Sequence, residues 1–250
     1  MKNIKILTIL SFSLLIIGGT STTVLLAQET SETAWRYRAI EVIDTPTAEV
    51  VDHYGYLVSF RFGKDGNLQN KSIFGVFPRL NLGFGLDGEN VIGTGDTRLN
   101  KPTINVKFRL FDGKGILPAF ALGYDGQGYV YNRPAGEYEQ REKGFYAVTT
   151  SEILVPNMFL NVGVNRFDFD HGDTTRAFAG WSYTYEQIVG LMFEWDHATK
   201  YKERRLNYGL KYFITPVFTV DLVGRNIPEH AGSSSRETER IVRLTYIGTF

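Results

Sequence analysis

Charged side chains recur at every second position in several segments of this chain, where they could bind ions, acidic ligands or one another. We expect these side chains to share one face, with Asp87 and Asp125 as further acidic members. The set comprises Arg61, Lys107, Arg109, Arg176, Glu194, Asp196, Arg205, Lys211, Asp221, Arg225 and Arg243. Such a face could be a ladder of ion pairs that packs a narrow interior. It could also form a modestly cationic path that engages acidic sugars or phosphates.

Groups with catalytic or metal-binding chemistry are sparse. The histidines each lie in or beside a different connection, so their spacing predicts no metal site: they are His53, His171, His197 and His230. His230 and Ser233 pair a base with a nucleophile, as in an outer-membrane lipid hydrolase. A hydrolase, however, needs these groups on rigid elements, and this loop is rich in Gly and Ser. We therefore expect no enzymatic activity and no catalytic residue.

One glycine motif resembles a cofactor site. The segment from Gly83 to Gly88 fits the pattern G-x-G-x-x-G. That motif binds a dinucleotide only between a strand and a helix, and these glycines fall inside an alternating strand that no helix follows. We expect no cofactor.

Composition narrows the class of protein. The 250 residues carry no net charge, which argues against a nucleic-acid partner. Cysteine is absent, so disulfides and thiolate metal sites are excluded. Aromatic residues make up 14% of the chain and glycines number 26, a blend typical of a barrel with aromatic girdles.

The first 27 residues read as a signal peptide. Lys2 and Lys5 precede an apolar run from Ile6 to Ile17, and Ala27 ends a plausible cleavage site. An uncleaved membrane anchor is the alternative. After Ala27 no apolar run approaches the roughly 18 residues of a membrane helix. If the mature protein enters a membrane, it must do so as a barrel.

The rest of the chain predicts an all-β fold. Residues 54–250 form about twelve segments in which apolar and polar residues alternate, each near ten residues long. Tight turns and long loops alternate between them, as expected for a single antiparallel transmembrane barrel with periplasmic turns and external loops. A soluble barrel with inverted faces is the alternative. Residues 28–53 could be an extra strand, a periplasmic arm or a plug in the lumen, and an even strand count favours the arm or the plug.

The last segment, from Ile241 to Phe250, alternates cleanly and ends on an aromatic residue. Tyr246 and Phe250 resemble the signal that barrel-assembly machinery reads, although Gly248 stands where a second aromatic residue is usual. We therefore expect insertion into the outer membrane of a Gram-negative-type bacterium, with outer-membrane lipid and that machinery as partners.

Several strand motifs resemble the YjbH-like family of outer-membrane barrels. They run from Asp87 to Gly93, from Pro102 to Leu110, from Pro118 to Asp125 and from Phe145 to Val148, and the resemblance covers roughly residues 46–170. It implies a non-enzymatic role in export or assembly of an exopolysaccharide, with surface polysaccharide or its export proteins as partners. Typical members are much longer than this chain. A passive narrow pore for small or acidic solutes is the alternative function.

Overall fold

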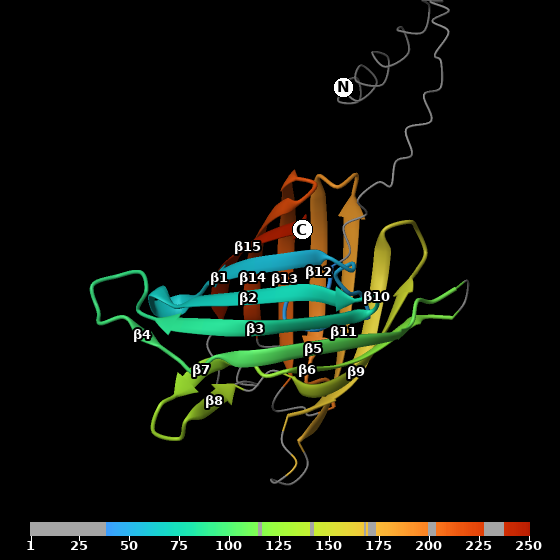
Figure 1. Ribbon diagram of the computed structural model, residues 1–250. Coiled ribbons are helices and arrows are strands. Elements are labelled where there is room, and N and C mark those ends of the chain that lie inside the picture. Colours follow the sequence, from blue (N-terminus) through green and yellow to red (C-terminus); the bar gives the residue numbers. More distant parts are fainter. Residues whose placement is uncertain are drawn as a thin grey trace, which may run out of the picture. The chain divides into compact units, whose positions relative to one another are not determined.

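The computed structural model describes residues 39–250, apart from 115–116, 141–142, 168, 170–173, 200–203 and 228–237. The main body is a closed antiparallel barrel of twelve strands, as the sequence predicts (Figure 1). These strands are β1 (Gly55–Phe62), β2 (Leu68–Phe77), β3 (Leu80–Glu89), β5 (Thr103–Phe111), β6 (Ala119–Asp125), β9 (Gly144–Glu152), β10 (Met158–Arg166), β11 (Thr175–Tyr185), β12 (Val189–Asp196), β13 (Arg205–Thr215), β14 (Phe218–Ile227) and β15 (Glu239–Thr249).

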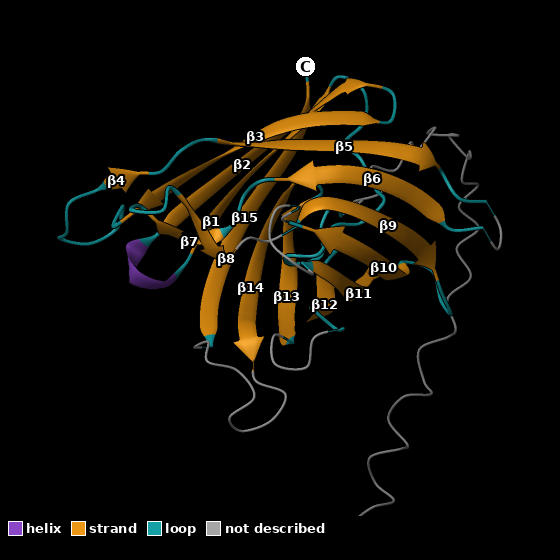
Figure 2. Cartoon of the chain, turned by 90° about the horizontal axis from the view of Figure 1, so that it is seen from below, coloured by secondary structure: helices purple, strands orange, loops and turns teal. Residues whose placement is uncertain are grey.

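Each strand pairs with its neighbours in the chain, and the first and last strands close the ring. Strand β1 runs antiparallel to β15, with Gly55 opposite Thr249 and Phe62 opposite Val242. Figure 2 shows the strands following one another in this order. We call the β1–β15 pairing the seam. Because the ring is closed, the twelve described barrel strands have no free edge, and the short strand β4 (Arg98–Leu99) adds to one end of β3.

Strand faces follow the predicted alternation. In β13, Arg205, Asn207 and Lys211 are buried, whereas Leu210 and Tyr212 are exposed. The polar face therefore points into the lumen and the apolar face points outward. The facing of β9 could not be predicted, because both of its faces carry small or apolar residues. In the structure, Tyr146, Val148 and Thr150 are the buried, inward members.

Connections differ between the two ends of the barrel. Residues 78–79, 112–118, 153–157, 186–188 and 216–217 join strands at what we call the short-turn end. The connection at Gly113 is longer than the predicted tight turn and contains a bridge between Lys114 and Leu117. The opposite, long-loop end carries the hairpin of β7 (Tyr129–Asn132) and β8 (Glu137–Gln140) and the 3-10 turn η1 (Lys64–Gly66). Among the residues described, no helix is long and apolar enough to cross a membrane.

The lumen contains a segment of the chain itself. Residues 40–51, which we call the plug, precede β1, and nearly all of them are buried. Glycines on the barrel wall make room for the segment that links the plug to β1. A Cβ atom on Gly75 would lie 1.9 Å from the carbonyl oxygen of Asp52, so only glycine permits this approach. The plug and the inward side chains therefore fill much of the barrel interior.

Candidate functional site

The eleven charged residues that the sequence suggests as a possible ligand path all lie on the interior of the barrel. Ten of them are buried, and the side chain of Arg61 is 12% exposed. They fall into groups along the barrel axis. One group surrounds the centre of the plug, a second lies toward the short-turn end, and a third lies toward the long-loop end.

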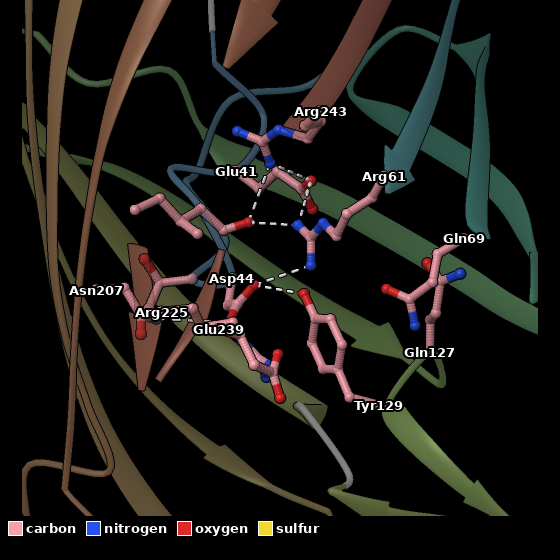
Figure 3. Close-up of polar contacts among 12 residues, drawn as sticks. Glu41, Asp44, Arg61, Gln69, Gln127, Tyr129, Asn207, Arg225, Glu239 and Arg243 are labelled. Carbon is pink, nitrogen blue, oxygen red and sulfur yellow. Dashed lines mark hydrogen bonds and ion pairs between the residues drawn. The ribbon is translucent and has the colours of Figure 1, made fainter. Parts of the chain in front are cut away.

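Asp44, at the centre of the plug, bonds residues of two barrel strands and of the β7–β8 hairpin (Figure 3). Its carboxylate accepts hydrogen bonds from Nε of Arg225 at 2.5 Å and from Nη1 of Arg61 at 2.9 Å. The hydroxyl of Tyr129, on the β7–β8 hairpin, donates to it at 2.6 Å. The Arg225 guanidinium also lies 3.3 Å from the centre of the Tyr129 ring, a cation–π contact. Asp44 therefore ties the hairpin, the plug and the wall together.

Glu194, on β12, holds the backbone of the plug. Its Oε1 accepts hydrogen bonds from the backbone N–H groups of Ile43, Asp44 and Thr45 at 2.6 to 2.9 Å. The hydroxyl of Thr45 donates to the same oxygen at 2.6 Å. Consecutive N–H groups that converge on one point form an anion-binding concavity. Here the anion is supplied by the barrel wall, so the plug is bound much as a ligand would be.

Two arginines face each other at the seam. Arg61 on β1 is the direct partner of Arg243 on β15. Glu41 of the plug lies 2.8 Å from Nη1 of Arg243 and 3.7 Å from Nη2 of Arg61. Burial alone would raise the pKa of Glu41, but the charges of Lys71, Arg243 and Arg61 outweigh it and hold the pKa at about 2.

The plug's carbonyl groups add to this neutralisation at the seam. Arg243 donates to the carbonyl oxygens of Ile43 and Val42 at 3.0 and 2.7 Å, and Arg61 donates to that of Ile43 at 2.8 Å. The free space beside Asp44 and Arg61 is only about 10 Å³. The plug therefore both fills the lumen and neutralises the seam.

A cross-strand ladder continues from the seam. Asp221 on β14 accepts hydrogen bonds from Lys211 on β13 at 2.7 Å and from Nε of Arg243 at 2.7 Å. This part of the interior matches the expectation of ion pairs between neighbouring strands. Most of the other basic residues, in contrast, pair with the plug or with loops.

The second group fixes the other half of the plug. Nζ of Lys107 donates to the carbonyl oxygens of Ile40 and Glu49 at 2.6 and 3.1 Å. Arg109 forms an ion pair with the Glu49 carboxylate at 2.7 Å. Asn81 bonds both the N–H and the carbonyl group of Val51. Both ends of the plug are therefore fastened to the wall by polar contacts.

The third group lies toward the long-loop end, where its charged side chains contact neighbouring strands and loops. Asp196 forms a buried ion pair with Lys143 at 2.8 Å. Arg205 contacts a ring nitrogen of His197 at 3.1 Å. Arg176 donates to the carbonyl oxygen of Thr175 at 3.0 Å, and its guanidinium lies 5.7 Å from the ring centre of Phe167. These contacts fill the lumen near the long-loop end.

The acidic residues of the plug, namely Glu41, Asp44 and Glu49, were not predicted from the sequence. A signal for them was present. The lumen face predicted from the strands has eight basic residues and only five acidic ones. A narrow interior cannot keep such an excess of buried charge, so additional carboxylates had to come from outside the strands. Tyr129 and Lys143 were also missed, because they lie on the second long loop.

The remaining predicted residues lie elsewhere. Tyr246 and Phe250 are exposed on the outer face, and the rings of both approach Tyr56, at 6.0 and 5.0 Å between centroids. The segment from His230 to Ser233, together with His171 and the predicted signal peptide, lies outside the described residues. In the described ranges, no group of three or more His, Asp or Glu side chains could hold a metal ion.

The chain was also compared with known proteins. No model of a known protein family matches it, and no curated protein matches it either.

Proposed function

We propose that this protein is an outer-membrane β-barrel that assists the export or assembly of a surface polysaccharide without catalysing a reaction. The observation that carries the membrane placement is the outward apolar face of the barrel. Val162, Leu210 and Leu222 are each about half exposed, at 48%, 49% and 57%. An apolar surface that continues round a barrel is costly in water and is satisfied by lipid.

Aromatic residues on the outer face support the same placement. Tyr54, Tyr185 and Tyr212 lie near strand ends and are more than half exposed. Rings with one apolar and one polar side are favoured at the boundary between lipid and water. On this proposal the short turns face the periplasm, the long loops face outward, and a signal peptide is removed after export.

The polysaccharide role is supported by the strand motifs that resemble the YjbH-like family. The non-enzymatic character is supported by how the interior is used, because Glu194, Arg225 and Arg243 hold the plug in place. In the part of the chain that the structure describes, the plug occupies the lumen. This arrangement does not favour a passive pore.

Two experiments test this function. Outer-membrane fractions should contain the protein as a compact band that shifts on a gel after boiling, with a soluble periplasmic protein as control. If the protein were instead soluble and its band did not shift on boiling, the membrane placement would be overturned. A deletion strain should then show reduced surface polysaccharide that the intact gene restores. Unchanged polysaccharide in that strain would overturn the export role and leave the barrel standing.

A further inference from the structure

A sizeable cavity lies beside the plug in the lumen. It measures about 600 Å³ and lies at the short-turn end. Its wall includes Phe159 and Asn161 from β10, Ser182 and Thr184 from β11, and Val42 from the plug. This volume is in the range of small-molecule binding sites.

The cavity exists because one part of the wall has small inward residues. Gly180 on β11 touches the plug, since a Cβ atom there would lie 2.8 Å from Oγ1 of Thr45 and 3.0 Å from a methyl group of Val42. Beyond that contact, the inward positions are Ser182, Thr184 and Gly190. None of these side chains reaches far into the lumen, and the plug does not fill the space they leave.

Charge on the lining is balanced. Arg109 pairs with Glu49 and Asp112, and Lys211 pairs with Asp221. Lys114 and Glu152 complete the charged members. Basic and acidic lining residues are therefore equal in number, and the strongest cations already have carboxylate partners. An anionic ligand would have to break these pairs, which favours an uncharged ligand.

Uncharged hydrogen-bonding groups and apolar surface share the rest of the lining. The hydroxyl-bearing residues Ser182 and Thr184 line the cavity together with Phe159, whereas the buried amide of Asn161 is already bonded to Thr150 and to the carbonyl oxygen of Gly180. Hydroxyl groups beside an aromatic ring and a thioether such as Met192 suit a ligand with many hydroxyl groups and apolar ring faces.

We propose that this cavity binds a short neutral saccharide. The binding of a neutral saccharide follows from the lining alone. That this saccharide belongs to an exported polysaccharide rests on the function proposed above. Val42, Thr47 and Glu49 of the plug form part of the wall. A bound saccharide would therefore contact the plug and stabilise its seated position.

The test uses the full-length protein in a detergent without a sugar headgroup. Saturation-transfer NMR would compare neutral maltotriose and cellotriose with anionic trigalacturonate. We expect saturable binding of a neutral trisaccharide, at least tenfold weaker binding in Thr184→Trp, and unchanged binding in the matched control Thr149→Trp, whose side chain lies on the outer face away from the cavity. Absence of neutral-sugar binding, preference for the anionic sugar, or full binding by Thr184→Trp would each overturn the site.

Two further readouts keep the test decisive. If Thr184→Trp lacks the heat-shifting band of a folded barrel, Ser182→Leu replaces it as the filling variant. The bound sugar should also slow hydrogen exchange at the amides of Val42 and Thr47, and unchanged exchange would contradict contact with the plug. If a filling variant loses binding while its strain keeps normal polysaccharide, the site stands and the export role falls.

Discussion

Arg61 and Arg243 lie directly opposite each other across the β1–β15 seam, and Glu41 of the plug bridges them. Like charges at facing positions of an antiparallel pair are destabilising. Glu41 therefore reduces the repulsion across the seam, together with Asp44, which pairs with Arg61, and Asp221, which pairs with Arg243. Closure of the barrel and occupation of its lumen are linked by this contact and by the bonds from Arg61 and Arg243 to the plug backbone.

Replacing Glu41 by Gln should destabilise the barrel by about 2 to 3 kcal/mol, because it leaves two largely buried arginines without their shared counter-charge. The urea midpoint of the compact gel band would measure this loss. Glu89→Gln is the matched control, since Glu89 pairs with Arg133 in a more exposed position, and it should cost under about 0.5 kcal/mol. Equal shifts for the two variants would contradict the role of the plug at the seam.

Glu194→Gln should loosen the plug without opening the strands. The glutamine keeps the size of the side chain but removes the charge that three backbone N–H groups and one hydroxyl share. We expect the opening free energy of the amides of Ile43 and Thr45 to fall by about 2 kcal/mol, a roughly 30-fold faster hydrogen exchange. Amides in β10 serve as the internal control and should exchange as before. A uniform acceleration would indicate general unfolding instead.

A glycine pair separates close approach from general flexibility. Gly75→Ala would place a methyl group against the backbone of Asp52, and we expect a loss of about 1 to 3 kcal/mol in stability. At Gly63 an added Cβ atom meets nothing within 4 Å, so Gly63→Ala should be close to neutral. Urea unfolding of both variants in the same detergent would measure the difference. A neutral Gly75→Ala would show that the segment linking the plug to β1 shifts easily.

Acid should weaken the plug's hold on the wall. The pKa of Glu41, a plug residue outside the strands, falls from its usual 4.5 to about 2. For Asp44 burial opposes ionisation, but the charges of Arg225 and Arg61 outweigh burial and hold the pKa well below its usual 3.8. A carboxyl group whose pKa is lower in the folded protein stabilises the fold fully at pH values above its unfolded-state pKa. This contribution is lost as the pH falls through the folded-state pKa.

The resulting stability should be constant above about pH 5 and should decline from about pH 4 toward pH 2. Urea midpoints measured across this range would show the decline. In Glu41→Gln the decline should be smaller, because one of the two carboxylates no longer titrates. A profile that is identical in the two proteins would assign the acid sensitivity to other groups.

Removing the plug should turn a closed barrel into an anion-preferring pore. Deletion of residues 40–50 takes away Glu41, Asp44 and Glu49 and leaves Arg61, Arg225 and their neighbours facing water. In planar bilayers the intact protein should show little steady conductance. The deletion variant should conduct, with a reversal potential that favours chloride over potassium.

The variant Glu41→Gln/Asp44→Asn/Glu49→Gln provides a second test if the deletion variant does not fold. It should show brief openings, since the plug keeps its shape but loses its ion pairs. Equal, steady conductance in the intact protein would mean that the plug does not occlude the lumen in a bilayer.

The strands and their faces could be predicted because a strand has a strict two-residue period. Lys211 and Leu210, for example, can only point to opposite faces. The plug had no such period. Its residues around Asp44 are held by Glu194 and Arg225, more than 100 positions away, and no local pattern encodes those contacts. Only the excess of basic residues on the lumen face pointed to missing acidic partners.

The facing of β9 illustrates a second limit. Thr149 and Thr150 are the same residue type, yet only Thr150 faces inward, where it bonds the plug at Ala48 and the side chain of Asn161. The alternation signal fails where both faces carry small or apolar groups, and tertiary contacts then decide the register. The cavity beside Thr184 was unpredictable for a related reason, since its size depends on where the plug turns.

The plug and its partners lie far apart along the chain, and this separation determines when during folding the plug can be seated. Glu41 precedes every strand, yet its contact with Arg243 spans 202 positions. The plug cannot be fully seated until the last strand has arrived, and the arrival of that strand also closes the ring. An occupied lumen is thus a mark of completion: a chain halted before β15 would leave both the ring and the plug open to the surroundings.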